Sequence, residues 1–252
     1  MNLVKVSSEN TAAVILAGGF GTRIKHLLGD LPKPMAPVNG KPFLEWVVRW
    51  LAAQNIRRVV LSTGYLTETI EKHFSSQPVA GVTVSCVPET TPLGTAGGFL
   101  NAVHQSQINS SAWFLLNGDT LAFADLADAI NALRTESTAG VIFGRDVPDT
   151  SRYGSLVSDA TGRLESFAEK RPGQGVISTG IYLFRDTLLQ QFSNRVPLSL
   201  EQEVFPALTK AGVSLKVLRM NAPFLDIGTP DTLREADAFI QKNLTQFQNE
   251  NV

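Results

Sequence analysis

The sequence predicts an α/β fold with a mostly parallel sheet, and three observations support this. Apolar runs of strand length alternate with stretches of helical periodicity through the first half of the chain. The intervals between the apolar runs are those of βαβ units. Of the 252 residues, 43% are hydrophobic and 18% are charged, which is typical of a globular core. One domain over residues 1–252 is therefore expected.

The first half is expected to alternate strands with helices. Each strand is a short apolar run. The first helix follows Pro42 and carries Trp46, Val47, Trp50 and Leu51 at helical spacing, as expected for a core-facing stripe. Connections between parallel strands should be right-handed. In chain order the expected elements are strand 12–16, helix 43–55, strand 58–63, helix 66–74, strand 82–87, helix 95–107 and strand 112–117.

The second half has shorter strands separated by turns. Asp159 to Gly162 has the composition of a hairpin turn, and Ser199 is a good cap for a following helix. Pro230 suits the first position of a last helix that ends near Lys242. The expected elements are strands 140–147, 154–159, 164–170 and 177–185, helix 199–212, strands 214–220 and 224–228, and helix 230–242.

Composition excludes several classes of protein. The net charge of −1 argues against a general nucleic-acid binder. No apolar run reaches the ~18 residues of a membrane span, and the polar N-terminus does not resemble a signal peptide. The single cysteine, Cys86, allows no intramolecular disulfide. We therefore expect a soluble cytoplasmic protein that binds neither nucleic acid nor a membrane.

A glycine-rich loop, LAGGFGTRI (16–24), follows the first expected strand. Ligands of open α/β sheets bind beyond the carboxyl ends of the strands. Gly18, Gly19 and Gly21 would let backbone N–H groups approach a polyphosphate closely. The glycine spacing is neither that of a dinucleotide-binding motif nor that of a P-loop. A tight surface turn is the alternative for so short a motif.

Two cations accompany this loop. Arg23 can bind phosphate with two parallel hydrogen bonds. Lys33 stands between Pro32 and Pro34, which stiffen the segment that carries its charge. Solvated surface side chains are the alternative for both cations. A stiff loop with a positioned charge suits phosphoryl or nucleotidyl chemistry.

The combined string LAGGFGTRI…LPKPMAPVNGKPFLEW resembles the leading signature of the sugar-1-phosphate nucleotidyltransferases. Its form GDLPKPMAPVNGKPFLEW is most similar to the D-glycero-D-manno-heptose 1-phosphate guanylyltransferases. The resemblance extends through nearly the whole chain. It implies a Rossmann-like α/β fold with a mixed, mostly parallel central sheet flanked by helices. It also implies a nucleotide-binding half at about 11–120 and a sugar-binding half at about 121–242. The polar composition of the last ten residues, 243–252, favours a fraying tail.

The resemblance implies a reaction that needs no nucleophilic side chain. An oxygen of the sugar 1-phosphate attacks the α-phosphorus of a nucleoside triphosphate, and pyrophosphate leaves. Arg23 is expected to stabilise charge on the pyrophosphate, and Lys33 to bridge phosphate oxygens, so these two are the catalytic candidates. His26, His73 and His104 have no metal-ligand spacing and are expected on the surface.

Two distant aspartates are the metal candidates. Asp119 lies in NGDT (117–120) after an expected strand, and Asp226 lies in FLDIGTP (224–230). Mg²⁺ is commonly held by one or two carboxylates together with substrate phosphates. A turn former at Asp119 and a helix-proximal cap at Asp226 are the alternatives. The resemblance implies that the pair holds Mg²⁺ against the α-phosphate.

A second glycine-rich stretch, VPETTPLGTAGGFL (87–100), is where the resemblance places the base. Glu89 could accept both the N1–H and N2–H₂ donors of guanine, whereas uracil and thymine present an acceptor–donor–acceptor edge. A solvated loop glutamate is equally consistent with the chemistry alone. With the resemblance, Glu89 favours GTP. The nucleotide-binding candidates are Leu16, Ala17, Gly18, Gly19, Gly21, Thr22, Glu89, Gly94 and Thr95.

The sugar pocket is predicted from the resemblance alone. FAEKRPG (167–173) resembles the family's Glu-Lys-Pro element, with Arg171 as a departure that leaves the register uncertain by one. SRYGSL (151–156) and STGIYLF (178–184) resemble further sugar-contacting segments. Ordinary strands and turns are the alternative for each. The sugar-binding candidates are Asn117, Tyr153, Gly154, Glu169, Lys170, Ser178 and Thr179.

The sequence thus predicts an Mg²⁺-dependent enzyme that forms a nucleotide sugar and pyrophosphate. Its expected partners are a nucleoside triphosphate and a sugar 1-phosphate, with GTP and a manno-heptose 1-phosphate as the specific expectation. UTP, dTTP or CTP with another sugar 1-phosphate or phosphocholine is the first alternative. A non-catalytic sugar-nucleotide sensor is the second. The sequence leaves open whether the chain forms a homo-oligomer.

Overall fold

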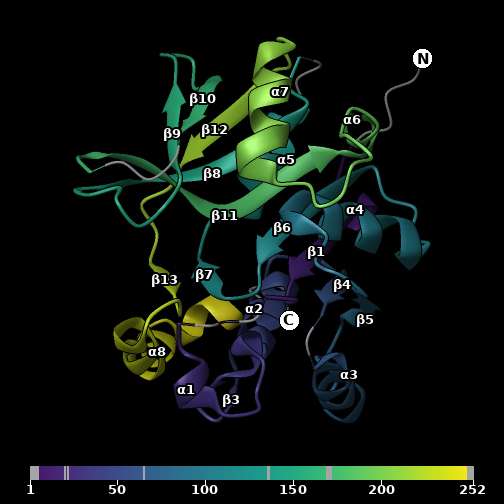
Figure 1. The fold of residues 1–252 in the computed structure, drawn as a ribbon, viewed down its shortest axis with the longest axis vertical. Helices are drawn as coiled ribbons and strands as arrows, with labels where there is room; N and C mark the ends of the chain where they lie inside the picture. Colours follow the sequence, from purple (N-terminus) through teal and green to yellow (C-terminus); the bar gives the residue numbers. More distant parts are fainter. Residues whose placement is uncertain are drawn as a thin grey trace.

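The computed structural model describes residues 6–19, 21, 23–64, 66–134, 137–168 and 172–248. Within these residues a nine-stranded sheet forms the centre of the fold, in the order β10–β9–β11–β6–β1–β4–β5, with β8 pairing β11 and β12 pairing β8 (Figure 1). Its strands are β1 (Thr11–Leu16), β4 (Arg58–Thr63), β5 (Thr83–Pro88), β6 (Ala112–Asn117), β8 (Gly140–Val147), β9 (Ser155–Ser158), β10 (Leu164–Ala168), β11 (Gly175–Arg185) and β12 (Leu215–Arg219).

The expected mixed, mostly parallel sheet is confirmed. Strands β1, β4, β5 and β6 run parallel, and β11 joins β6 in the antiparallel direction. The antiparallel strands β9, β10 and β11 extend the sheet in the second half. The change from parallel to antiparallel pairing beside β6 divides the sheet near the boundary between the two expected halves.

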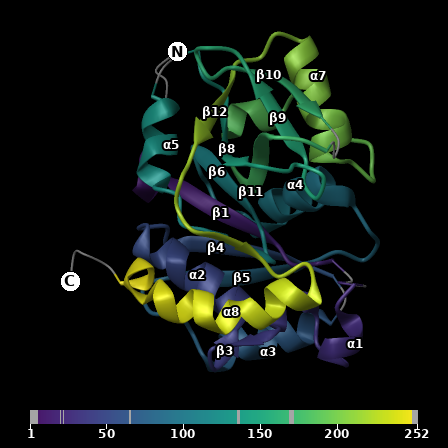
Figure 2. The same ribbon diagram turned by 90° about the vertical axis from the view of Figure 1, so that its left-hand side faces the viewer.

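The helices cover both faces of the sheet and bury two apolar cores. Successive side chains of β1 alternate between them, with Ala13 and Ile15 in one core and Ala12 and Val14 in the other. Figure 2 shows α8 in front of α2, on the face that the first core occupies. That face carries α2 (Phe43–Ala53), α3 (Thr67–Ser76), α5 (Leu126–Ala132) and α8 (Pro230–Lys242), and the other carries α4 (Gly94–Ser106), α6 (Asp186–Leu189) and α7 (Phe205–Lys210).

Helix 199–212 is the least accurate of the element predictions. The Ser199 cap is confirmed, because its hydroxyl accepts the Gln202 N–H at 3.1 Å. Residues Leu200–Val204, however, form a π-helical turn, and α7 begins only at Phe205. Pro206 has no N–H to donate, so the regular hydrogen-bond ladder is interrupted at this junction.

The chain beyond α8 packs instead of fraying. Leu244–Phe247 form a short 3₁₀ helix, η4. The Phe247 ring lies 4.8 Å from the ring of Trp46 and 5.5 Å from that of Phe123. The prediction of a fraying tail is therefore wrong for Leu244–Phe247, because the Phe247 side chain extends the core. Among the described helices, none has the length and apolar character needed to cross a bilayer.

Several short elements were not expected from the sequence. The strands β2 (Pro37–Val38) and β3 (Lys41–Pro42) form a hairpin around Asn39 and Gly40, which both have positive φ. Lys25–Leu28 form a single helical turn, α1, and Lys33–Met35 form a 3₁₀ turn, η2. The strands β7 (Thr120–Ala122) and β13 (Phe224–Asp226) pair outside the main sheet.

A buried carboxylate ties the hairpin to two helices. The Glu45 side chain in α2 is 1% exposed, and it accepts from Arg49 at 2.7 Å and pairs with Lys41 of β3 at 3.2 Å. His73 of α3 lies 2.8 Å from its second oxygen and is largely buried, so the expected surface position of His73 is wrong. Burial would raise the pKa of Glu45, but hydrogen bonds from Arg49, His73 and Lys41 outweigh it and hold the pKa below its usual value.

We predict that Glu45→Gln lowers the free energy of unfolding by about 2 kcal/mol at pH 7, because Lys41 and Arg49 lose their shared carboxylate and His73 loses a charged hydrogen-bond partner. The loss stays below that of a fully buried pair because Lys41 and Arg49 are about one-third exposed. A lowered folded-state pKa gives stability that is present above the unfolded pKa of about 4.3 and is lost as the pH falls through the folded value.

Denaturant unfolding at pH 7 and in acid measures this effect. The difference between wild type and Glu45→Gln should shrink below about pH 4. Glu68→Gln, at an exposed position of α3, is the matched control and should change stability by less than about 0.5 kcal/mol. An equal loss for both variants, or a Glu45→Gln effect independent of pH, would contradict the prediction.

Candidate active site

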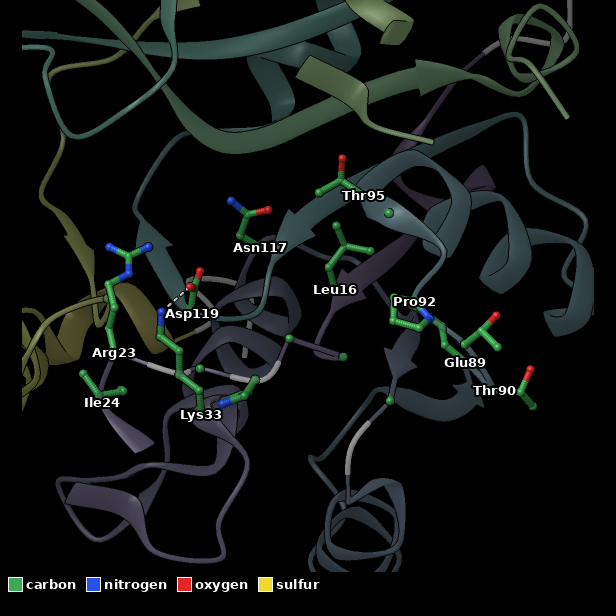
Figure 3. Close-up of a pocket in the computed structure, with 18 residues that line it drawn as sticks. Leu16, Arg23, Ile24, Lys33, Glu89, Thr90, Pro92, Thr95, Asn117 and Asp119 are labelled. Carbon is green, nitrogen blue, oxygen red and sulfur yellow. Dashed lines mark hydrogen bonds and ion pairs between the residues drawn. The ribbon is translucent and has the colours of Figure 1, made fainter. Parts of the chain in front are cut away.

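The first glycine-rich loop opens onto a cavity of about 720 Å³ (Figure 3). It lies where parallel strands end, since Leu16 closes β1, Gly64 follows β4, Glu89 follows β5 and Asn117 closes β6. This is the edge at which α/β sheets bind ligands. The cavity is lined by Leu16, Gly18, Gly19, Gly21, Arg23, Ile24, Lys33, Pro34, Gly64, Glu89, Thr90, Thr91, Pro92, Gly94, Thr95, Asn117, Asp119 and Gly228.

The glycine loop is packed closely against its surroundings. Gly21 has φ +56°, and a Cβ there would lie 2.6 Å from Cβ of Lys33. Glycine is therefore required for the lysine segment to pass so close. Ala17 is buried, and its N–H donates to the Ser62 carbonyl at 2.7 Å, so this residue anchors the loop without lining the cavity. Thr22 lies outside the described residues.

An ion pair joins the lysine segment to the end of β6. The Lys33 ammonium lies 2.5 Å from Oδ2 of Asp119, and the two side chains are 12% and 34% exposed. In Figure 3 the Arg23 guanidinium lies at the same end of the cavity as Lys33 and Asp119. Two cations and a carboxylate thus share one wall, which is the charge arrangement expected for a phosphate-handling site.

The pairing of β13 with β7 brings Asp226 beside the Asp119 segment, although Asp226 is not among the residues that line the cavity. In that pairing Asp226 stands opposite Thr120, and the N–H of Ile227 donates to the Asp119 carbonyl at 2.9 Å. The carboxylate is held at both oxygens. Oδ1 accepts from the N–H of Gly228 at 3.0 Å, and Oδ2 accepts from the Tyr153 hydroxyl. The structure therefore brings together two aspartates separated by more than a hundred positions in the sequence.

The two aspartates fit a divalent cation. Hard cations such as Mg²⁺ prefer carboxylate oxygens and complete their coordination with water and substrate phosphate. Asp119 supplies such oxygens at the cavity wall, and Asp226 supplies them beside it, where the Arg152 guanidinium also lies 3.4 Å from Oδ2 of Asp226. The described residues contain no cluster of three or more metal-ligating side chains, so an all-protein cage is not available there.

Glu89 is held at the cavity wall by two hydrogen bonds. Its Oε1 accepts from the Ser62 hydroxyl at 2.8 Å, and its Oε2 accepts from the N–H of Leu93 at 3.1 Å. The side chain is half-buried. An ionised carboxylate has about four acceptor sites, so the protein uses only part of its capacity. The remaining lone pairs are available to a ligand.

The start of α4 is bound by a segment from the second half of the chain. The N–H groups of Ala96 and Gly97 both donate to the Leu198 carbonyl, at 3.0 and 3.2 Å. The Thr95 hydroxyl donates to Glu201 at 3.0 Å and accepts from the N–H of Leu200 at 2.9 Å. Thr95 lines the cavity, but its hydroxyl is already engaged on both sides.

Only one of the described sugar candidates lines the cavity. Asn117 lines the cavity, whereas Tyr153, Gly154, Ser178 and Thr179 do not. The Ser178 hydroxyl lies 2.9 Å from that of Tyr182, and its N–H donates to the Gly154 carbonyl at 2.9 Å. Thr179 is 1% exposed and donates to the Phe143 carbonyl, so the structure places it in the sheet and away from the cavity. The last two candidates, Glu169 and Lys170, lie outside the described residues.

Some lining residues were missed by the sequence analysis. The loop after β5 contributes Thr90, Thr91 and Pro92, which share with Glu89 the position just beyond a strand end. Gly64 occupies the corresponding place after β4. The rule that ligands meet strand carboxyl ends would have identified these positions. The other missed lining residues are Ile24, Pro34 and Gly228.

Guanylyltransferases are among the known proteins to which this chain is similar. The chain is 32% identical over 220 residues to the D-glycero-alpha-D-manno-heptose 1-phosphate guanylyltransferase of Campylobacter jejuni, covering 87% of this chain and 95% of that protein. It is 31% identical over 242 residues to the mannose-1-phosphate guanylyltransferase of Mycobacterium tuberculosis, covering 95% of this chain and 67% of that protein.

The fold has a close counterpart among solved structures. HddC from Yersinia pseudotuberculosis superposes with a TM-score of 0.79 at 33% identity, over 90% of this chain and 98% of that chain. The same protein complexed with GMP-PN superposes with a TM-score of 0.77. The model of the family described as nucleotidyl transferase matches residues 12–243. With nearly the whole chain matched, the resemblance found in the sequence is confirmed, and the protein belongs to the nucleotidyl transferase family.

Proposed function

We propose that this protein transfers a guanylyl group from GTP to a manno-heptose 1-phosphate, releasing pyrophosphate. The observation that carries the proposal is the shared cavity wall on which Lys33 pairs with Asp119 beside Arg23. The named activities of the relatives from Campylobacter and Mycobacterium support guanylyl transfer to a sugar 1-phosphate. The heptose acceptor is favoured because the Campylobacter protein matches this chain over nearly its full length.

The first task of the site is to bring two anions together. Arg23 and Lys33 lie at the end of the cavity where the phosphates would meet, and their charges offset the repulsion between the two reactants. Arg23 would stabilise charge on the departing pyrophosphate through bidentate hydrogen bonds. Lys33 would bind phosphate oxygens near the reacting centre.

No side chain has to remove a proton from the acceptor. The phosphate of a sugar 1-phosphate is already ionised at neutral pH, so its oxygen is nucleophilic without a general base. The residues of the cavity therefore act by positioning and by charge. Asp119 and Asp226 would hold the divalent cation, for which we propose Mg²⁺. When bound, that cation neutralises charge on the transferred phosphate.

Base selection is proposed for Glu89. Its hydrogen bonds with Ser62 and Leu93 fix the carboxylate at the wall of the cavity. A fixed carboxylate matches the two adjacent donors of guanine, while a carbonyl in their place would leave it facing another acceptor. The sugar-contacting role of Asn117 is supported by its place at the cavity wall.

The proposal is tested by pyrophosphate release with Mg²⁺, using GTP, ATP, UTP, dTTP and CTP against sugar 1-phosphates that include manno-heptose and mannose. We expect release with GTP and a manno-configured acceptor. Mannose 1-phosphate as the better acceptor would move the assignment toward the activity named for the Mycobacterium relative. Release with a pyrimidine triphosphate alone would contradict the base assignment, and no release with any pair would favour a sensor.

We predict that Lys33→Ala lowers kcat about 10²- to 10³-fold, because a positioned cation next to developing charge is worth roughly 3 kcal/mol. Stability should change little, since Asp119 is one-third exposed and can be hydrated when its partner is removed. Steady-state kinetics and thermal unfolding measure the two effects. Lys72→Ala, at an exposed position of α3, is the matched control and should retain full activity. A Lys33→Ala enzyme within a few-fold of wild type would exclude a catalytic role.

Glu89→Gln is predicted to lower kcat/KM for GTP about 10- to 100-fold, because a charged acceptor of two hydrogen bonds is lost. Inosine triphosphate, which lacks the N2 amino group, serves as the substrate control. The wild type should prefer GTP over inosine triphosphate, and the variant should lose most of that preference. An unchanged preference in the variant would show that Glu89 does not read the amino group.

A further inference from the structure

Tyr153 was expected to line a sugar pocket, but the structure gives it a different partner. The residue lies in the turn between β8 and β9, where its N–H donates to the Thr150 carbonyl at 3.1 Å. Its hydroxyl donates to Oδ2 of Asp226. Tyr153 is not among the residues that line the cavity. Among the described residues, the hydrogen-bond partner of the Tyr153 side chain is thus a carboxylate that would hold the divalent cation.

The ring of Tyr153 is fixed so that the hydroxyl meets Asp226. It packs edge-on against the ring of Phe224, with centroids 5.8 Å apart and planes at 77°. Phe224 is the first residue of β13 and Asp226 is the last. The same short strand therefore supplies the ring that packs on Tyr153 and the carboxylate that accepts its hydrogen bond. The Arg152 guanidinium lies 5.3 Å from the ring centroid on a half-exposed side chain. Phe224 and Arg152 together restrict where the ring can go.

The hydroxyl is the closest side-chain donor to this carboxylate among the described residues. Arg152 lies farther from Asp226, at 3.4 Å from Oδ2, and it is too exposed to contribute as much.

With the N–H of Gly228 on Oδ1 and the Tyr153 hydroxyl on Oδ2, both oxygens of Asp226 have fixed partners. Such partners orient a metal-binding carboxylate. We propose that Tyr153 is a positioning residue that acts through Asp226 on the binding of the divalent cation. The inference rests on the proposed function, since it takes Asp226 as a metal ligand.

The test is the affinity for Mn²⁺, followed by its electron paramagnetic resonance signal, with GTP present and no sugar 1-phosphate. Tyr153→Phe keeps the ring on Phe224 and removes only the hydroxyl. We expect it to weaken Mn²⁺ binding about 10- to 100-fold. Tyr182→Phe is the matched control, since it removes a buried hydroxyl that bonds to Ser178 and does not touch Asp226, and its Mn²⁺ affinity should equal that of wild type.

The outcomes separate this inference from the proposed function. Equal Mn²⁺ affinity in wild type and Tyr153→Phe would overturn the inference and leave the proposed function intact. Absence of Mn²⁺ binding in the wild type would overturn the metal role of Asp226 and the inference with it. A wrong sugar would leave the result unchanged, because no acceptor is present in the assay.

Kinetics distinguish positioning from direct contact with the sugar. If Tyr153 acts through Asp226, rising Mg²⁺ concentration should restore most of kcat in Tyr153→Phe, and KM for the sugar 1-phosphate should match that of wild type. A raised KM for the sugar 1-phosphate at saturating Mg²⁺, with normal Mn²⁺ affinity, would assign Tyr153 to the sugar pocket and overturn the inference.

Discussion

The pairing of β13 with β7 is the contact on which the candidate site depends. It joins a strand near the C-terminal end of the chain to one that follows β6 directly. Without this pairing, Asp119 would be the one described carboxylate near Lys33, with which it forms an ion pair. With it, Asp226 is brought beside Asp119, and the site gains a second negative charge near its cations. Two strands more than a hundred positions apart in the sequence thus meet through main-chain hydrogen bonds beside the charged residues of the site.

The first glycine-rich loop depends on packing as much as on charge. Gly21 lets the Lys33 segment approach, and the hydrogen bond from Ala17 to Ser62 fixes the start of the loop on β4. Beyond Lys33, the β2–β3 hairpin leads into α2, where Glu45 ties hairpin, α2 and α3 together. The lysine is therefore carried by a segment held at both ends. A charge held in this way needs little reorganisation when a phosphate arrives.

The sequence was sufficient for the sheet and for the glycine loop, because both are signalled by local patterns. The β2–β3 hairpin could also have been predicted from the sequence, because Asn39-Gly40 is a strong turn signal. His73 could have been placed in the core from its neighbours, as Ile70 and Phe74 lie on the same face of α3. Similarly, the near-continuous apolar run of β11 signals burial on both faces, which explains the position of Thr179.

Other parts of the site could not be predicted from local pattern. Asp226 could be matched with Asp119 only through family resemblance, because nothing in either segment specifies the pairing of β13 with β7. Tyr153 was expected at the sugar for the same reason, yet its hydroxyl is directed at Asp226 by the packing of its ring on Phe224. Resemblance identifies which residues gather at a site. Which atoms face each other is decided by tertiary packing.

The Leu198 carbonyl affects which end of the cavity can attract an anion. It accepts the N–H groups of Ala96 and Gly97, which belong to the first turn of α4. The free amides and positive end of a helix would otherwise form a natural anion site beside the second glycine-rich stretch. With those amides occupied by the protein's own carbonyl, this end of the cavity offers little attraction to phosphate. The phosphates of a nucleotide that entered the cavity would therefore be drawn to Arg23 and Lys33 at the other end. Its uncharged base would be left beside α4.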